Sequence, residues 1–228
     1  MQTMNLTMNK KPVESAEQPV VPLKAVVRQR KRLSKEARSE EVRKTIFAAA
    51  AEVVGERGYA DASISRITDV AGIAQGTFYL YFESRQALFD ELLPTIGQEM
   101  LEYLRQGVAG AKDVFDVEER AFRALFEYID RRPGFSRILR EAEFVAPAAY
   151  EKHYKRLCER YMDSLERGVQ SGQIRHFSHN ELETVANMLI AARAYLLYDA
   201  RRKIRNGEPV ELEEIIQTYM KLVRKGLR

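Results

Sequence analysis

The 228-residue sequence predicts an all-α protein, and three observations support this prediction. Apolar residues recur every three to four positions over most of the chain after Arg38, which is the period of a helix that buries one face. No segment keeps the alternation of apolar and polar residues that a half-buried strand requires. Capping patterns of serine, aspartate and glycine separate the periodic segments.

The composition restricts the class of protein. Hydrophobic residues make up 45% and charged residues 31% of the chain, which is typical of a globular protein. The single cysteine, Cys158, excludes intrachain disulfides and metal sites built on thiolate clusters. The amino end has no apolar signal segment, and the longest apolar run, "TVANMLIAARAYLLY", is short and contains Arg193. We therefore expect a cytoplasmic protein without a membrane span.

Residues 1–36 form the first of three expected domains. They contain three prolines, show no sustained period and end in "RQRKRLSK", so we interpret them as a flexible basic arm. Residues 1–44 contain eleven Lys or Arg and five Glu, a net charge of +6, whereas the whole chain carries +4. Positive charge gathered at one end indicates a polyanion partner. A solvated tail without a role is the alternative.

Residues 37–84, the second expected domain, are predicted to hold three helices, at 38–58, 63–71 and 75–82. Ser63 is a good N-cap for the second helix, and Gly72 suits its end. The short link "AGIA" between the second and third helices fits a helix-turn-helix, which lays its second helix in the major groove of DNA.

The third of these helices has two unlike faces. Phe78 and Phe82 are four residues apart and share one face, where they can anchor the helix to its own domain. The opposite face is uncharged and comprises Gly76, Thr77, Tyr79 and Leu80. A glycine lets the backbone approach DNA closely, hydroxyls bond phosphates or base edges, and a leucine can contact a thymine methyl group. We interpret this face as a DNA-reading surface.

Residues 85–228, the third expected domain, are predicted to form a larger helical bundle. Ser84 begins a helix that we expect to bend near Pro94, and Asp116 begins the next one with Glu119 placed for a capping box. Later helices are expected at 134–143, 146–169, 178–204 and about 211–226. The pattern "SHNE" at 178–181 is a second capping box.

The segment "ASISRITDVAGIAQGTFYLYFESRQALF" resembles the DNA-binding signature of the TetR-type bacterial repressors, a family whose signature joins Gly-Thr, an aromatic pattern and a following helix start. The resemblance covers about residues 38–100. It implies that DNA is faced by Gln75, Gly76, Thr77, Tyr79, Leu80 and Tyr81. It also implies that Ser63, Ser65 and Arg85 hold phosphates.

Two departures from the family pattern change the electrostatics of this segment. Ala74 stands where a serine is usual, and the missing cap should cost about 1 kcal/mol unless Ile73 packs against Phe78 as a hydrophobic staple. Gln75 stands where a lysine is usual. Because this helix then lacks that positive charge, the attraction to phosphates must come from basic residues nearer the amino end. These are Arg28, Arg30, Lys31, Arg32, Lys35, Arg38, Arg43 and Lys44. We hypothesise that the arm touches DNA, as minor-groove arms do.

Aromatic and apolar residues in the remaining chain are candidates for two further sites. Those for a ligand cavity are Phe122, Phe126, Phe144, Tyr154, Tyr161 and Met188, with plain core packing as the alternative. The resemblance implies an effector pocket among these helices and a dimer interface made by the last two. Candidates for that interface are Leu189, Ala192, Leu196, Ile216, Tyr219 and Val223, unless they face their own core.

Catalytic and metal signatures are missing from the sequence. His176 and His179 have no third ligand nearby, and we find no Ser/His/Asp order, paired carboxylates or phosphate-cradling glycine loop. We therefore expect no enzyme activity, no metal and no cofactor.

The combined reading is a ligand-responsive transcription regulator, a repressor that binds a palindromic double-stranded DNA operator as a homodimer. The resemblance implies its release by a small, largely apolar effector that favours another conformation. Two alternatives stay open: a DNA-binding protein controlled by a protein partner without a small-molecule effector, and an all-α scaffold that merely contains a similar hairpin.

Deletion of residues 1–33 tests the role of the arm. We expect the slope of log K against log salt to flatten by about 0.9 for each phosphate that the arm would otherwise neutralise, because fewer counterions are then released. The measurement is a salt titration of DNA binding by the full chain and the truncated chain. An unchanged slope contradicts the hypothesis.

Overall fold

The computed structural model describes residues 34–227, so residues 1–33 of the predicted arm at 1–36 lie outside them, while Lys35 and Glu36 belong to the first helix. The chain divides into two units after Ser39, and the contacts below lie within the second unit. The helices in the described part are α1 (Lys35–Arg57), α2 (Ile64–Ala71), α3 (Gln75–Phe78), α4 (Arg85–Gly107), α5 (Val114–Arg131), α6 (Phe135–Val145), α7 (Pro147–Gln170), α8 (His179–Arg205) and α9 (Leu212–Leu227). The all-α prediction is confirmed.

The predicted second helix has both of its expected ends. The Ser63 hydroxyl accepts a hydrogen bond from the backbone N–H of Arg66, 3.3 Å away, which caps the start of α2. Gly72 ends the helix in the left-handed region, with φ +66°, where a residue with a Cβ would be strained. This turn leads directly into α3, which contacts α2.

α3 ends four residues earlier than the predicted helix at 75–82. Ala74 supplies no capping hydrogen bond, as expected. After Phe78 the chain tightens into turns, because Leu80 and Tyr81 donate to carbonyls three residues back. Phe82 still donates to the Phe78 carbonyl at 3.1 Å. Both phenylalanines are therefore buried on one side, even though the regular helix is short.

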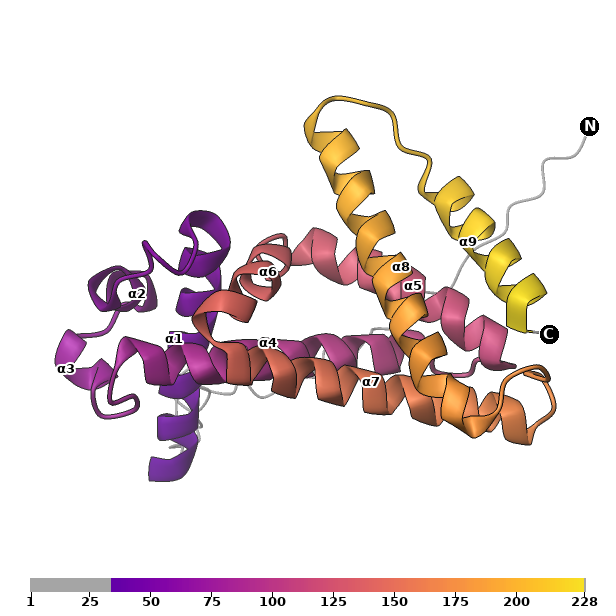
Figure 1. Ribbon diagram of the computed structural model, residues 1–228. Coiled ribbons are helices and arrows are strands. Elements are labelled where there is room, and N and C mark those ends of the chain that lie inside the picture. Colours follow the sequence, from indigo (N-terminus) through magenta and orange to yellow (C-terminus); the bar gives the residue numbers. More distant parts are fainter. Residues whose placement is uncertain (1–33, 228) are drawn as a thin grey trace, which may run out of the picture. The chain divides into compact units, whose positions relative to one another are not determined.

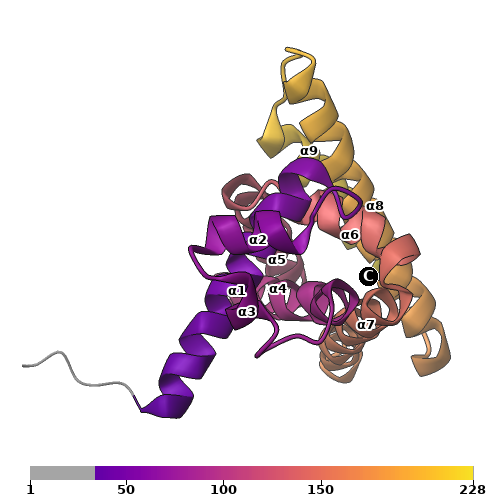
Figure 2. The same cartoon turned by 90° about the vertical axis from the view of Figure 1, so that its left-hand side faces the viewer.

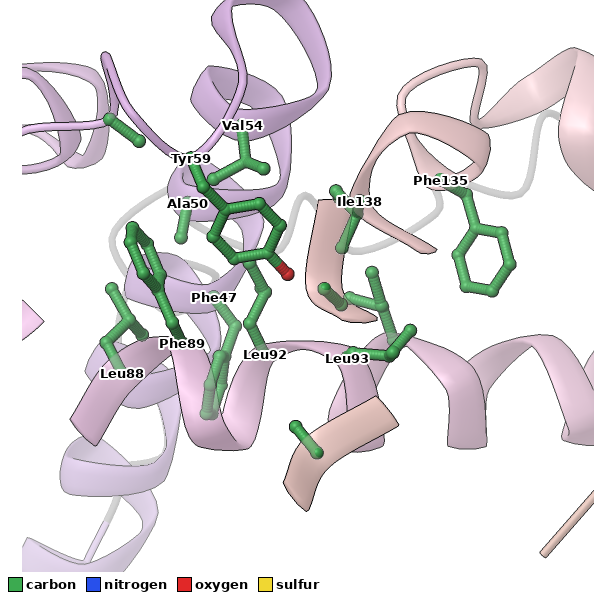
Figure 3. Close-up of a cluster of buried hydrophobic side chains, with 14 of the residues drawn as sticks. Phe47, Ala50, Val54, Tyr59, Leu88, Phe89, Leu92, Leu93, Phe135 and Ile138 are labelled. Carbon is green, nitrogen blue, oxygen red and sulfur yellow. The ribbon is translucent and has the colours of Figure 1, made fainter. Parts of the chain in front are cut away.

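A continuous apolar core joins α1 and α3 to α4 and α6. Phe47 of α1 meets Phe82 edge to face, with ring centroids 5.4 Å apart. Figure 3 shows Tyr59, just beyond α1, among side chains such as Val54 and Phe89. The rings of Tyr59 and Phe89 also pack edge to face, at 4.7 Å. Ile73 packs against the same cluster, as a staple would.

The remaining helices pack around α4 and α7. These two run side by side in Figure 1, and Figure 2 looks along them. α4 continues through Pro94. α5 contacts α4 and α9, and α8 contacts α7. α5 begins earlier than predicted, because Asp113 rather than Asp116 is its N-cap and accepts from the Asp116 N–H at 2.7 Å. The capping box of Ser178 is present.

The first turns of α6 hold the end of α1 through ionic hydrogen bonds. Arg137 donates to the Glu56 carbonyl at 2.6 Å and to the Glu141 carboxylate at 2.7 Å. Glu141 also accepts from the backbone N–H of Tyr59 at 2.8 Å. Burial alone would raise the pKa of Glu141, but these hydrogen bonds outweigh it and lower that pKa. The carboxylate is therefore charged at neutral pH and bridges both segments.

Beside this carboxylate the backbones of α1 and α6 meet directly. A Cβ built on Gly55 would lie 2.6 Å from the Cα of Gly134, which is closer than real atoms approach. Two glycines are thus required for the helices to come this near.

Gly55→Ala tests that close approach. We expect the free energy of unfolding to fall by about 1–3 kcal/mol, since the new methyl group must push two backbones apart. The measurement is urea denaturation. The matched control is Gly226→Ala in α9, where an added Cβ meets nothing within 4 Å and helix propensity predicts a gain of about 0.5–1 kcal/mol. Equal effects of both substitutions contradict the assigned contact.

Candidate DNA-binding surface and ligand cavity

The outer face of α3 and the following turn is exposed and uncharged. Leu80 is 81% exposed and Tyr79 is 56% exposed, while Gln75 and Gly76 are also exposed. Thr77 is only half-buried. A Cβ on Gly76 would meet nothing within 4 Å, so the protein's own packing does not require a glycine here. The surface can therefore offer a flat backbone, hydroxyls and an apolar side chain to a partner.

The residues expected to bind phosphates differ in their exposure and in the hydrogen bonds that they form within the protein. The hydroxyl of Ser63 caps α2, whereas Ser65 is exposed. Arg85 is exposed, and its guanidinium donates to the Ala60 carbonyl at 3.3 Å, which fixes its position beside the surface. Tyr81 is half-buried and packs against the core.

Arg43, which we expected to attract phosphates, is engaged within the protein. It forms an ion pair with Glu91 and lies over the ring of Phe82, 4.8 Å from the centroid. Its charge is thus partly neutralised, and this departs from the expectation because Glu91 lies 48 residues further along the chain.

A cavity of about 1000 Å³ lies among α4, α5, α6, α7 and α8. This volume is at the upper end of the range of small-molecule sites, about 300–1,000 Å³. Its apolar lining includes Met100, Leu104, Leu125, Ile129, Leu139, Leu157, Ile190 and Leu197. Its charged lining comprises Arg137, Arg140, Arg193, Arg201, Arg202, Arg205 and Glu143. An apolar chamber with a surplus of arginines is suited to an apolar ligand with an anionic group.

Two buried polar side chains line this cavity. Burial lowers the pKa of His153 to about 4, with the charge of Arg156 acting in the same direction, so its imidazole is neutral at pH 7. Arg193 is buried next to Glu118, with Nε 3.5 Å from Oε1. The Glu118 carboxylate accepts from the hydroxyl of Tyr161 at 2.6 Å and from that of Tyr219.

Large apolar side chains on α8 and α9 are exposed. Met188 and Tyr195 on α8 are 66% and 67% exposed, and Leu222 on α9 is 73% exposed. Scattered single apolar residues are common on surfaces, but three on two sequential helices indicate a candidate interaction face.

The comparisons with known proteins agree with this geometry. The family model for the bacterial regulatory proteins of the tetR family matches residues 46–92, which hold the helix-turn-helix. The uncharacterized HTH-type transcriptional regulator YdgC of Bacillus subtilis is 29% identical over 162 residues, or 68% of this chain and 79% of that protein.

The matched segment is a TetR-type helix-turn-helix. A second relative, the HTH-type transcriptional repressor KstR2 of Rhodococcus jostii, is 27% identical and covers 78% of this chain and 87% of that protein. The fold is shared with the regulator FadR from Bacillus subtilis, solved in complex with stearoyl-CoA, at a TM-score of 0.68 and 19% identity over 81% of this chain and 99% of that one. The chain is a DNA-binding transcriptional regulator and, like these relatives, not an enzyme.

The residues predicted to line a ligand site are divided by the structure. Phe144 and Tyr154 line the cavity. The other four candidates lie elsewhere: Phe122, Phe126, Tyr161 and Met188. Phe122 packs against Phe126 at 5.1 Å between centroids, and Met188 is 66% exposed. Helical spacing identifies an inward face, but not whether the neighbouring helix fills the space in front of it.

The predicted dimer residues are divided in the same way. Ile216, Tyr219 and Val223 are buried in the chain's own core with α5, which was the alternative stated for them. Leu189, Ala192 and Leu196 on α8 are only partly buried. The exposed residues Tyr195 and Leu222 are not among the predicted dimer residues, and Met188 was predicted for the ligand site, because the apolar stripes are broad enough for more than one face.

Metal-binding groups and membrane-spanning helices can be sought only among the residues that the structure describes. Within residues 34–227, no three His, Cys, Asp or Glu side chains are grouped so that they could hold a metal ion. No helix among those residues has the length and apolar character needed to cross a membrane.

Leu80→Ala tests the predicted DNA-reading surface of this regulator. Because the side chain is 81% exposed, folding should be unaffected, while removal of one apolar interaction with a base should weaken operator binding by about fivefold or more. The measurement is fluorescence anisotropy with operator DNA and, as the control, with random DNA of equal length. An equal loss on both DNAs contradicts the assignment.

Proposed function

We propose that this regulator is a repressor that binds a palindromic operator as a homodimer and is released by a ligand with an apolar chain and an anionic head, of the acyl-CoA class. The observation that carries the proposal is the cavity of about 1000 Å³ with its apolar lining and its arginines. KstR2, one relative, is a repressor by name, which supports the sign of regulation.

The charge distribution around the cavity supports an anionic head. Arg140 and Arg205 are exposed, so the lining reaches the surface where they lie. Arg202 pairs with Asp199, whereas the lining itself contributes Glu143 as its carboxylate. Phosphates and carboxylates are bound well by guanidinium groups. FadR from Bacillus subtilis was solved with stearoyl-CoA, which combines such a head with a long acyl chain.

The exposed faces of α8 and α9 support the homodimer. A single helix-turn-helix contacts one half-site, and two-fold dimers reach successive major grooves about 34 Å apart. Met188, Tyr195 and Leu222 would be removed from water in a face-to-face pairing of two copies. Leu189, Ala192 and Leu196 would lie at the border of that contact.

The mechanism of release is a population shift that α6 can transmit. Phe135, Arg137 and Leu139 of α6 line the cavity, and Arg137 also holds the end of α1. A ligand that fits one position of α6 better than another therefore biases the position of α1 and of the helix-turn-helix packed on it. It must bind the form that does not bind DNA more tightly, or the equilibrium does not move.

Operator release tests the proposed function. An operator is first selected from a random DNA pool, and binding is then measured by anisotropy with palmitoyl-CoA, with free CoA as the control. We expect two chains per operator and at least a tenfold loss of affinity with about 100 Kd of palmitoyl-CoA. Free CoA lacks the apolar chain and should have little effect.

Other outcomes distinguish the alternatives. Operator binding that palmitoyl-CoA leaves unchanged contradicts the effector part and favours control by a protein partner. Equal affinity for selected and random DNA contradicts sequence-specific regulation altogether and favours the scaffold.

A further inference from the structure

One buried donor at the cavity has no acceptor within the described part of the protein. Arg193 on α8 lines the cavity and is only 7% exposed. Its Nη1 atom makes no hydrogen bond to any residue among 34–227. Buried polar groups in proteins are nearly always paired, because leaving a desolvated N–H unpaired is unfavourable. This donor belongs to a side chain that lines a ligand-sized cavity, so an acceptor from outside the chain can satisfy it where the ligand reaches the cavity wall.

Glu118 balances the charge of Arg193 without taking up this donor. Its two carboxylate oxygens each lie 2.6 Å from the Tyr161 hydroxyl, and Tyr219 donates to the same group. The contact of Arg193 Nε with Glu118 is 3.5 Å long, beyond the 2.7–2.9 Å of a strong charge-assisted bond.

The guanidinium keeps its charge in this setting. Burial acts to lower the pKa of Arg193, but the negative charge of Glu118 and the tyrosine oxygens hold it above its usual value. The group also lies over the ring of Tyr161, 4.7 Å from the centroid, which fixes the plane of the fork. A positioned, charged donor is suited to select one ligand atom.

Arg193 lies away from the arginines at the end of α8. Ile190, Ala194 and Leu197 of the same helix line the cavity beside it. Arg201 and Arg205 follow eight and twelve residues later on α8, which at about 1.5 Å per residue is roughly 12–18 Å along the helix. The α8 side of the cavity thus has a positive position at Arg193 that is separate from the one at Arg201 and Arg205.

We propose that Nη1 of Arg193 binds a carbonyl or carboxylate oxygen of the ligand, so that this residue selects acyl compounds over plain alkyl compounds of the same length. The proposal rests on the proposed ligand-responsive function and adds a specificity-determining residue to it. The oxygen can come from the thioester of an acyl-CoA or from the carboxylate of a free fatty acid, and each source gives a different result below.

The test compares direct binding of two probes by isothermal titration calorimetry. Palmitoyl-CoA and its thioether analogue S-hexadecyl-CoA have the same head and chain length and differ in the carbonyl oxygen. The wild-type chain should bind palmitoyl-CoA about tenfold more tightly, since the thioether cannot accept the hydrogen bond from the charged donor. Palmitate is the third probe and reports the carboxylate source.

The variants separate recognition from folding. Arg193→Met alone would leave the Glu118 charge without its counterion and would destabilise the core. The test variant is therefore the double substitution Glu118→Gln and Arg193→Met. Its control, Glu118→Gln alone, keeps the Arg193 donor but removes the counterion, so a lower melting temperature is expected for it. A second control, Arg205→Gln, removes a charge from the other end of α8. Thermal melts establish that each variant is folded.

The expected result is loss of discrimination in the double variant alone. Its affinities for palmitoyl-CoA and the thioether should agree within about twofold, whereas Glu118→Gln keeps the tenfold preference and Arg205→Gln weakens both probes alike. If Arg193 instead selects the carboxylate, palmitate binds the wild type and binds the double variant more weakly. In that case the wild type binds palmitoyl-CoA and the thioether with equal affinity. Either pattern supports the role of Arg193.

Two results overturn the proposal and differ from each other. A preference for palmitoyl-CoA that survives in the folded double variant rejects Arg193 while leaving the acyl ligand in place. Failure of the wild type to bind any of the three probes rejects this proposal together with the acyl ligand of the proposed function.

Discussion

The backbone contact between Gly55 and Gly134 is the constraint on which the rest of the structure depends. With no side chain between them, the end of α1 and the start of α6 leave no room to slide past each other. Arg137 and Glu141 add hydrogen bonds to the backbone on the α1 side of the joint. Because packed contacts of this kind are not continuously deformable, a displacement of α6 is passed to α1 rather than absorbed. The cavity-lining helix α6 and helix α1 of the helix-turn-helix domain therefore share one stiff joint.

The reading surface depends on that stiffness because it has little charge of its own. Phe78 and Phe82 fix its orientation by burial, and Arg43 is held by Glu91. An uncharged face gains affinity only when its hydroxyls and Leu80 meet the right base edges, so its contribution to binding is sensitive to small changes of angle. The proposed role of this face therefore requires strict positioning by α1, because under that proposal a modest shift of the joint would move these groups away from the bases.

The sequence predicted the local structure well because capping and period are local properties. Ser63, Gly72 and Ser178 were read directly as helix ends. Asp113 was missed because Asp116 lies three residues later and offers the same chemistry, and only the folded backbone selects between them. Phe122 and Tyr154 show the limit for the site: both are aromatic at helical spacing, yet one fills a core and the other lines a cavity. That difference depends on how far apart neighbouring helices stand.

Arg193 stands out in the sequence because it is the one charged residue in the apolar run "TVANMLIAARAYLLY". Its role could not be predicted from this run, because the residues that it contacts lie elsewhere in the chain. Glu118 lies 75 positions earlier and Tyr219 on another helix, so their convergence is a tertiary fact. Burying such an ion pair is costly, and well-packed apolar residues of similar volume often give equal or greater stability. Stability alone therefore does not account for a charged pair at the wall of a cavity. A guanidinium that Glu118 neutralises but does not saturate is accounted for if its remaining donor has an acceptor in the ligand.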